Sequence, residues 1–232
     1  MKPWELLGKV RVPGGTEVMT LQRRDTEYRL NVDGHLLMSS LTRASEEDLA
    51  RIGCRGLSGA KRPSVLIGGL GMGFTLAAAL KALGPGARVF VSELLPEVVE
   101  WNRGPLADLA GRPLEDPRVT VLQEDIAAIW RRERSAYDAI LQDVDNGHEG
   151  LTLKANDWLY AEDGLAAAGR ALKPGGVLAF WLAKSHAEFA KRVSRAGFQV
   201  SEVPVRGRDG HRGAHHVILV ASPRPADSKR RP

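Results

Sequence analysis

A glycine-rich turn and three acidic residues are the parts of this sequence that could do chemistry. The turn is Gly69-Leu-Gly71-Met-Gly73, and it follows the apolar run Val65–Ile67. Glycines let the backbone turn sharply and approach a ligand closely, and the amides that open the next helix can face a carboxylate or a ribose oxygen. The G-x-G-x-G spacing is tighter than the dinucleotide pattern G-x-G-x-x-G and favours a sulfonium nucleoside without a pyrophosphate. A plain tight turn is the alternative.

Acidic residues also end the next two apolar runs. Glu93 can accept hydrogen bonds from both ribose hydroxyls, and Leu94 beside it is a predicted contact of the same ligand. Asp125 can accept from an adenine amino group while Ile126 packs beside the ring. Structural roles are the alternatives: Glu93 as a strand-end charge that caps the following helix, and Asp125 as the N-cap of a helix over 126–131.

The fourth run of this kind ends in Gln142-Asp143-Val-Asp145-Asn146. Asp143 is the candidate catalytic residue, because a carboxylate there could orient a cationic amine and accept its proton during attack on carbon. Asp145 and Asn146 are predicted to contact the acceptor. In the alternative interpretation, residues 145–147 form a turn and Asp143 is its hydrogen-bonding partner.

The sequence predicts no metal site. His215 and His216 begin an apolar run, whereas His148 and His211 lie in loops, and no pair of cysteines accompanies them. A zinc site needs three or four ligands in a defined geometry.

Composition narrows the class of protein. The chain has 232 residues, 43% hydrophobic and 26% charged, as expected of a soluble globular protein. We expect neither a signal peptide nor a membrane span, and the single Cys54 fits a reducing cytoplasm. The net charge of +5 is scattered over the chain, without interleaved aromatic residues, so nucleic acid is not an expected partner.

The elements that must position these residues fall into three segments. Residues 1–60 contain short apolar runs separated by turn signals such as Asp33-Gly34, which predict a small antiparallel β unit, followed by a short helix that Ser45–Asp48 caps. Residues 61–222 alternate strands and helices, which predicts a mostly parallel sheet with a terminal antiparallel hairpin. Residues 223–232 are basic and proline-rich, and we expect them to be disordered. The strands are expected at 64–68, 88–93, 118–123, 137–143, 176–183, 198–205 and 215–221.

Taken together, the motifs resemble the spermidine synthase family, the polyamine aminopropyltransferases. The resemblance runs from Leu30 to about Ser222. Its pieces are Leu30–Gly34, Val65–Gly73, Val91–Val99, Asp116–Val121, Glu124-Asp125, Tyr137–Asp143 and Leu172–Gly176. It implies an α/β, Rossmann-like class I methyltransferase fold behind a small N-terminal β domain, and a homodimer. It further implies that Glu93 binds ribose, that Asp125 contacts adenine, and that Asp143 helps to deprotonate the attacking amine.

Several positions depart from the family pattern. The family has an Asp in the glycine loop where this chain has Met72, the second Asp of its D-x-x-D-P segment falls on Asn146, and its Gln after the Asp-Gly turn is Leu37. The family's aromatic and His residues in the next helix have no counterpart in Ser45–Cys54. The family residues that are missing here are mainly those that bind the diamine and the cationic tail of the donor.

The leading hypothesis is therefore a cytoplasmic transferase that binds S-adenosylmethionine or its decarboxylated form and transfers an alkyl (aminopropyl) group to an amine acceptor. An S-adenosylmethionine-dependent methyltransferase is the first alternative, because the glycine loop does not select the carbon that is attacked. A non-catalytic nucleoside-binding or assembly module is the second, because the polyamine-binding residues are depleted. The tight glycine spacing and the terminal hairpin both argue against an oxidoreductase.

Overall fold

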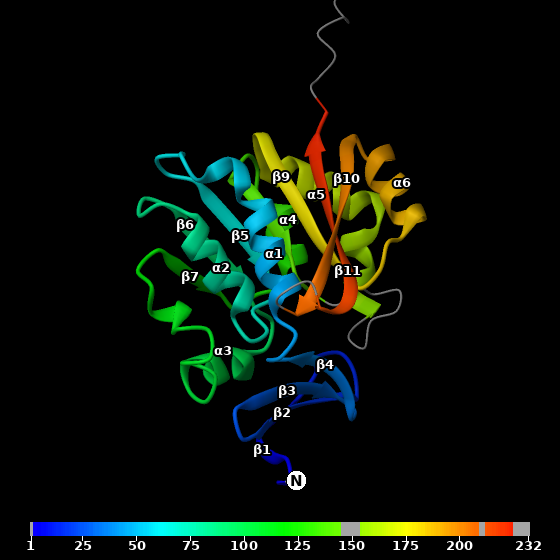
Figure 1. The fold of residues 1–232 in the computed structure, drawn as a ribbon. Coiled ribbons are helices and arrows are strands. Elements are labelled where there is room, and N and C mark those ends of the chain that lie inside the picture. The colour runs from blue at the N-terminus through cyan, green and yellow to red at the C-terminus, as the bar shows by residue number, and fades with distance from the viewer. Residues whose placement is uncertain (1, 145–153, 209–211, 225–232) are drawn as a thin grey trace, which may run out of the picture.

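The computed structural model describes residues 2–144, 154–208 and 212–224, which form two sheets and the helices that cover them. Figure 1 shows a small sheet beneath a larger one, with the N-terminus at the outer edge of the small sheet. Within the described ranges, no helix is both long and apolar enough to cross a bilayer.

The small sheet is an antiparallel meander in the order β1-β2-β3-β4. Its strands are β1 (Glu5–Arg11), β2 (Val18–Arg24), β3 (Glu27–Val32) and β4 (His35–Ser39). The turn between β3 and β4 uses Asp33 and Gly34, both with positive φ, and the Asp33 carboxylate also accepts a hydrogen bond from the Val18 amide at 2.8 Å. The predicted β unit is present, and its turn is fixed by the Asp-Gly pair that predicted it.

Helix α1 (Ala44–Gly53) follows, and its N-terminus differs from the expectation. Arg43 occupies the N-cap position without a side-chain hydrogen bond, and Ser45 is buried inside the first turn. Ser45–Asp48 therefore does not cap the helix. The reason is tertiary: the first turn lies against the rest of the molecule, so Ser45 and Glu46 are drawn inward.

The larger sheet has seven strands in the order β10-β11-β9-β8-β5-β6-β7. Strands β5 to β9 are parallel, whereas β11 pairs antiparallel with β9 and β10 pairs antiparallel with β11. Their bounds are β5 (Ser64–Gly68), β6 (Arg88–Ser92), β7 (Val119–Leu122), β8 (Tyr137–Gln142), β9 (Leu172–Leu182), β10 (Phe198–Arg208) and β11 (Arg212–Pro223). This is the predicted class I methyltransferase-like arrangement with a terminal hairpin.

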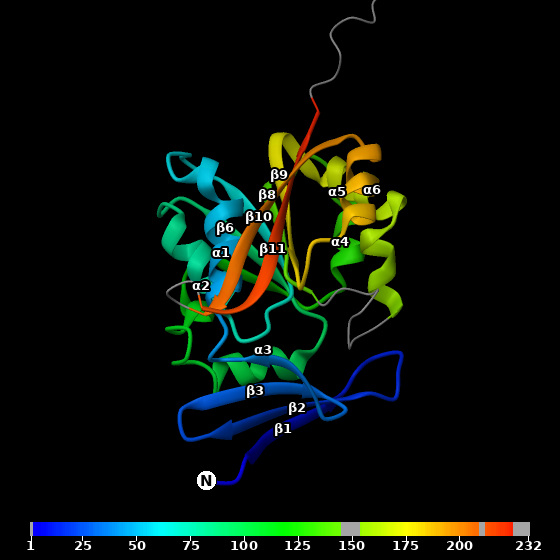
Figure 2. The ribbon, with the colours of Figure 1, turned by 45° about the vertical axis from the view of Figure 1, so that its right-hand side comes forward.

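Helices cover both faces of this sheet, as Figure 2 shows. Neighbouring residues of β5 point to opposite faces, so Val65 and Ile67 belong to one hydrophobic core and Leu66 to the other. The first core includes α1, α2 and α3, and the second includes α4, α5 and α6. Besides α1, the helices are α2 (Phe74–Ala82), α3 (Pro96–Arg103), α4 (Ile126–Arg132), α5 (Glu162–Ala171) and α6 (Ala187–Arg195), with 3-10 turns η1 (Arg55–Leu57), η2 (Pro113–Glu115) and η3 (Lys154–Tyr160).

Three strands extend beyond their predicted ranges: β9 at its start, β10 at its end and β11 at both ends. Strand β9 begins at Leu172, because Leu172 pairs with Tyr137 and the segment up to Val177 forms a bulge around Gly175, whose φ is 78°. Strand β11 continues to Pro223, and Arg224 donates a hydrogen bond to the Ser194 hydroxyl. The sheet thus extends past the expected boundary at residue 222, and residues 225–232 lie outside the described part of the chain.

Asp138 connects the beginnings of three adjacent strands. Its Oδ2 accepts hydrogen bonds from the Ser64 amide at 2.7 Å and from Lys173 Nζ at 2.6 Å. Ser64 begins β5 and is fully buried, so its amide has no access to water if this acceptor is lost.

We expect Asp138→Ala to lower the free energy of unfolding by about 1–3 kcal/mol, because the buried Ser64 amide would lose its acceptor. Asp138→Asn, which keeps an acceptor oxygen, should cost less than Asp138→Ala. Urea unfolding followed by circular dichroism measures both. Equal losses in the two variants would contradict this role for Asp138.

Candidate active site

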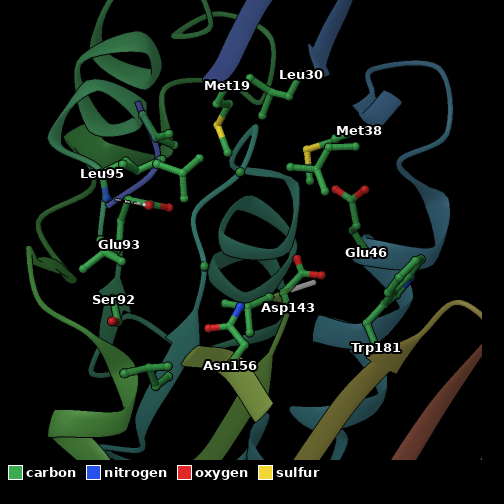
Figure 3. A pocket seen from close by; sticks show the side chains of 18 of the residues that line it. Met19, Leu30, Met38, Glu46, Ser92, Glu93, Leu95, Asp143, Asn156 and Trp181 are labelled. Atoms are coloured by element: carbon green, nitrogen blue, oxygen red, sulfur yellow. Dashed lines mark hydrogen bonds between the residues drawn. The ribbon is translucent and has the colours of Figure 1, made fainter. Parts of the chain in front are cut away.

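A cavity of about 420 Å³ lies between the carboxyl ends of the parallel strands and the small sheet. The strand ends contribute Glu93, Asp125 and Asp143, and the small sheet contributes apolar side chains that include Met19, Leu30 and Met38. Figure 3 shows these groups around the cavity, with Glu93 on one side and Glu46 of α1 on the other. Ligand crevices of open α/β sheets form at this end of the strands.

The glycine turn connects β5 to α2 at the bottom of this cavity. Gly69 has a φ of 89°, and a Cβ there would lie 2.9 Å from the backbone oxygen of Asp143. Both facts require glycine, because the turn passes directly beside the end of β8. Asn102 of α3 supports the turn, since its buried side-chain amide donates to the Gly71 carbonyl at 2.8 Å and to the Val98 carbonyl at 2.9 Å.

Glu93 is held by backbone amides at the end of β6. Its Oε2 accepts from the Leu70 amide at 3.1 Å and its Oε1 from the Leu95 amide at 2.9 Å. Burial raises the pKa of Glu93, and hydrogen bonds from the amides of Leu95, Leu70, Leu94 and Gly71 act in the opposite direction. Each oxygen has a further lone pair, so the carboxylate can still accept hydroxyl hydrogens from a ligand.

Asp125 occupies two positions that the sequence predicts: it caps a helix and it lines the cavity. It is the N-cap of α4, with its Oδ1 accepting from the Ala127 amide at 2.8 Å. It also lines the cavity, and so do Ile126, which is buried, and Leu94, which is exposed. The second oxygen of Asp125 and these two apolar side chains give the cavity one end suited to a flat heterocycle with an amino group.

Asp143 follows β8 and is the strongest candidate for proton transfer. Thr75 of α2 donates its hydroxyl hydrogen to Asp143 Oδ2, and its Oγ1 also lies 3.3 Å from the Glu46 carbonyl oxygen. Burial raises the pKa of Asp143 to about 7, although the Thr75 hydrogen bond lowers it. A hydroxyl has only one hydrogen, so both contacts are satisfied together when Asp143 is protonated and donates to Thr75.

Glu46 is a second acid in the same part of the cavity. It lies in the first turn of α1 and its residue is only 8% exposed. Burial raises its pKa well above the usual range, and the nearby charges of Asp143 and Glu47 raise it further. The cavity therefore contains two acids, Glu46 and Asp143, that disfavour each other's ionisation.

With this geometry established, the chain can be compared with known proteins. Polyamine aminopropyltransferases match a part of it: that of Corynebacterium efficiens is 31% identical over 162 residues, which are 68% of this chain and 29% of the relative. The enzyme of Mycobacterium tuberculosis is 30% identical over 165 residues, 69% of this chain and 30% of the relative. The chain thus spans less than a third of the length of these curated relatives. No family model matches it.

Solved structures with the same fold include spermidine synthases. The spermidine synthase of Thermotoga maritima superposes with a TM-score of 0.73 at 19% identity, over 94% of this chain and 72% of that one. A spermidine synthase in complex with the transition-state analogue AdoDATO has a TM-score of 0.72 at 18% identity, with the same coverage. A probable spermidine synthase of Corynebacterium glutamicum has a TM-score of 0.65 at 17% identity, over 97% of this chain and 82% of that one. The chain is thus similar in sequence to part of the polyamine aminopropyltransferases and shares the fold of the spermidine synthases.

The structure brings most of the predicted site residues together. The predicted residues that line the cavity are Gly69, Gly71, Glu93, Leu94, Asp125, Ile126 and Asp143. Gly73 does not line it and instead forms the left-handed N-cap of α2, with a φ of 83°. Asp145 and Asn146 lie outside the described residues. In the described part of the chain, no three His, Cys, Asp or Glu side chains gather as metal ligands would.

The interpretation of Met72 needs a correction. Its side chain is fully buried in the hydrophobic core and does not line the cavity, so it is not the residue that meets the donor's tail. The loop positions that line the cavity are Gly69 and Gly71, and a Cβ at Gly71 would lie 2.6 Å from the terminal methyl of Met38. The thioether of Met38 therefore occupies the space that a side chain at position 71 would need. Leu37, also singled out from the sequence, does line the cavity.

Sequence reasoning missed the residues that complete the cavity opposite Glu93. They are Met38, Glu46, Asn156, Trp181 and His216. Trp181 and His216 stack with ring centroids 4.7 Å apart, and the buried Nε1 of Trp181 has no hydrogen-bond partner among the described residues. Trp181 lies next to the last residue of the parallel strand β9 but is not an acid, and the others do not lie at the end of a parallel strand, so the pattern that identified the acids did not include them.

The raised pKa of Asp143 predicts a pH dependence of stability. The pKa of Asp143 is about 7 in the folded protein and 3.8 ordinarily, so the folded protein binds the carboxyl proton more tightly than the unfolded chain does. Stability is therefore lost as the pH rises from about 4 through 7. We expect Asp143→Asn to be more stable than the wild type at pH 8 by roughly 2 kcal/mol and to lose this advantage at pH 4. Urea unfolding at both pH values measures the difference.

The matched control is Glu47→Gln, which removes a carboxylate that forms an ion pair with Arg43 at 3.2 Å at the surface. Its stability difference from the wild type should change little over the same pH range. If Asp143→Asn and Glu47→Gln behave alike, the carboxyl of Asp143 does not hold a raised pKa.

Proposed function

We propose that the protein is a transferase that binds a sulfonium adenosine donor, S-adenosylmethionine or its decarboxylated form, and transfers an alkyl group, the aminopropyl group in the case of the decarboxylated donor, to an amine. The observation that carries the proposal is the placement of Glu93 and Asp143 in one cavity, with the glycine turn between them. An amide-held carboxylate suits a ribose, and a buried acid with a pKa of about 7 suits proton transfer near neutral pH.

The residues present fit the adenosine part of this donor. Glu93 offers acceptor oxygens for two ribose hydroxyls, Asp125 keeps one oxygen for an adenine amino group, and Ile126 with Leu94 offers apolar surface beside the ring. Gly69 and Gly71 let the ligand come close to the backbone where the sulfur would lie. When bound, the donor supplies a carbon activated by the adjacent positive sulfur.

The chain's own contribution to the reaction is to position the amine and to receive its proton. An ammonium group that enters beside Asp143 would transfer a proton to this carboxylate and become a neutral nucleophile. A bond from nitrogen to the carbon beside sulfur forms as the carbon–sulfur bond breaks, and its electron pair stays on sulfur. The products are a thioether nucleoside and the alkylated ammonium, and most of the acceleration would come from alignment in the cavity.

Methyl transfer is the second candidate function, and a specific observation favours it. The loop positions that line the cavity are Gly69 and Gly71, and Met38 packs against Gly71, so this loop offers no carboxylate to an aminopropyl ammonium. The two reactions differ in product: aminopropyl transfer leaves 5′-methylthioadenosine, and methyl transfer leaves S-adenosylhomocysteine. Cytoplasmic location, a homodimer and contacts of Asp145 and Asn146 with the acceptor remain predictions from the sequence.

Binding is tested first, by calorimetric titration with 5′-methylthioadenosine. We expect the wild type to bind it and Glu93→Gln to bind it at least tenfold more weakly, because an amide nitrogen cannot accept from the Leu70 or Leu95 amide. Glu97→Gln, which changes an exposed acid of α3, is the control and should bind as the wild type does. The proposed class would be excluded if the wild type bound none of three adenosine compounds: 5′-methylthioadenosine, S-adenosylmethionine and decarboxylated S-adenosylmethionine.

Turnover is tested second, by incubating each donor with a panel of amines. We expect one donor to yield its thioether, and Asp143→Asn to lower kcat at least ~100-fold, the smaller end of the contribution of a general base. Mass spectrometry of the thioether identifies the transferred group. Equal background release by the wild type and Asp143→Asn would instead support the non-catalytic nucleoside-binding module.

A further inference from the structure

Glu46 is a buried acid with no cation of its own. Its residue is 8% exposed, and among the described residues no Lys, Arg or His forms an ion pair with it. The neighbouring acid Glu47, by contrast, lies at the surface and pairs with Arg43 at 3.2 Å. Buried carboxyl groups are costly unless they are protonated or paired, so the position of Glu46 needs a reason.

Glu46 faces the same space as Asp143. Figure 3 shows both carboxyl groups at the cavity, from α1 and from the end of β8, with Met38 and Trp181 close to Glu46. Thr75 connects the two segments, because its hydroxyl contacts both Asp143 Oδ2 and the Glu46 carbonyl. Two acids placed side by side, without a cation from the described chain, form a site for a positive charge that the ligand brings.

The charge of the pair and its surroundings limit what that ligand can be. If the two acids share one proton, the pair carries a single negative charge, which matches one ammonium group. The described lining beyond Glu46 is mostly apolar and includes Met19, Leu30 and Met38. A second ammonium placed there would lose its hydration without a counter-charge, whereas an alkyl chain would be stabilised by burial.

We propose that Glu46 and Asp143 together bind the ammonium group of the acceptor, and that this pair selects amines with one charged nitrogen and an apolar remainder over diamines. This inference rests on the proposed function and adds the acceptor class to it. Glu46 binds the nitrogen and holds it beside Asp143, which receives the proton. Trp181 covers the alkyl chain, since it lines the same end of the cavity and stacks on His216.

The test compares pentylamine with 1,5-diaminopentane, two amines of the same chain length, by calorimetric titration of protein saturated with 5′-methylthioadenosine. Six titratable groups line the cavity, so all titrations use one pH near 8: Glu46, Glu93, Glu124, Asp125, Asp143 and His216. For the wild type we expect pentylamine to bind at least tenfold more tightly than the diamine.

The variant is Glu46→Gln and its matched control is Glu47→Gln. We expect Glu46→Gln to weaken pentylamine binding at least tenfold and to change 5′-methylthioadenosine binding less than twofold, a titration that also reports whether each variant is folded. Glu47→Gln should change neither. Tighter binding of the diamine by the wild type, or wild-type affinity for pentylamine in Glu46→Gln, would overturn the inference.

Two further outcomes separate this inference from the proposed function. If Glu46→Gln weakens S-adenosylmethionine binding but not pentylamine binding, Glu46 holds the amino group of the donor, and the acceptor assignment is wrong. If the wild type binds pentylamine but no adenosine compound, the proposed function fails while the paired-acid site stands.

Discussion

The parallel pairing of β5 with its two neighbours is the constraint on which the site depends. Gly68 pairs with Ser92 of β6 and with Gln142 of β8, so the residues that follow these three strands are brought together at one edge of the sheet. The glycine turn, Glu93 and Asp143 are those residues. Strand register brings these residues together. Asn102 then holds the backbone of the glycine turn by a hydrogen bond to the Gly71 carbonyl, and Thr75 holds the carboxyl group of Asp143.

The half of the site that follows this register could be predicted from sequence. Glu93, Asp125 and Asp143 each follow an apolar run that precedes a helix, and local pattern together with the crossover rule places such residues at one edge. Glu46 could not be found this way, because its role depends on how α1 packs against the large sheet, and the sequence around it also fits a helix N-terminus. Met38 and Trp181 are typical core residues by type. Met72 illustrates the converse error, since a residue within the motif points away from the cavity.

Charge in the cavity is arranged in two different ways. Glu93 is buried but receives four backbone amides, which stabilise its ionised form and keep it in place as an acceptor. Burial raises the pKa of both Asp143 and Glu46, and the charge of Asp143 raises that of Glu46 further, so these two acids hold their protons more tightly. In the proposed reaction, the carboxyl group of Glu93 is a fixed acceptor at one end of the cavity, and the carboxyl group of Asp143 receives a proton at the other.

The cavity has walls from two sheets that share no hydrogen-bonded strands. The strand-end acids and the glycine turn belong to the large sheet, whereas Met19, Leu30 and Met38 belong to the small one. Substitutions in the small sheet can therefore reshape the acceptor end without changing the backbone that surrounds Glu93. Under the proposed function, related chains can in this way differ in the amine they accept while they bind the same adenosine compound.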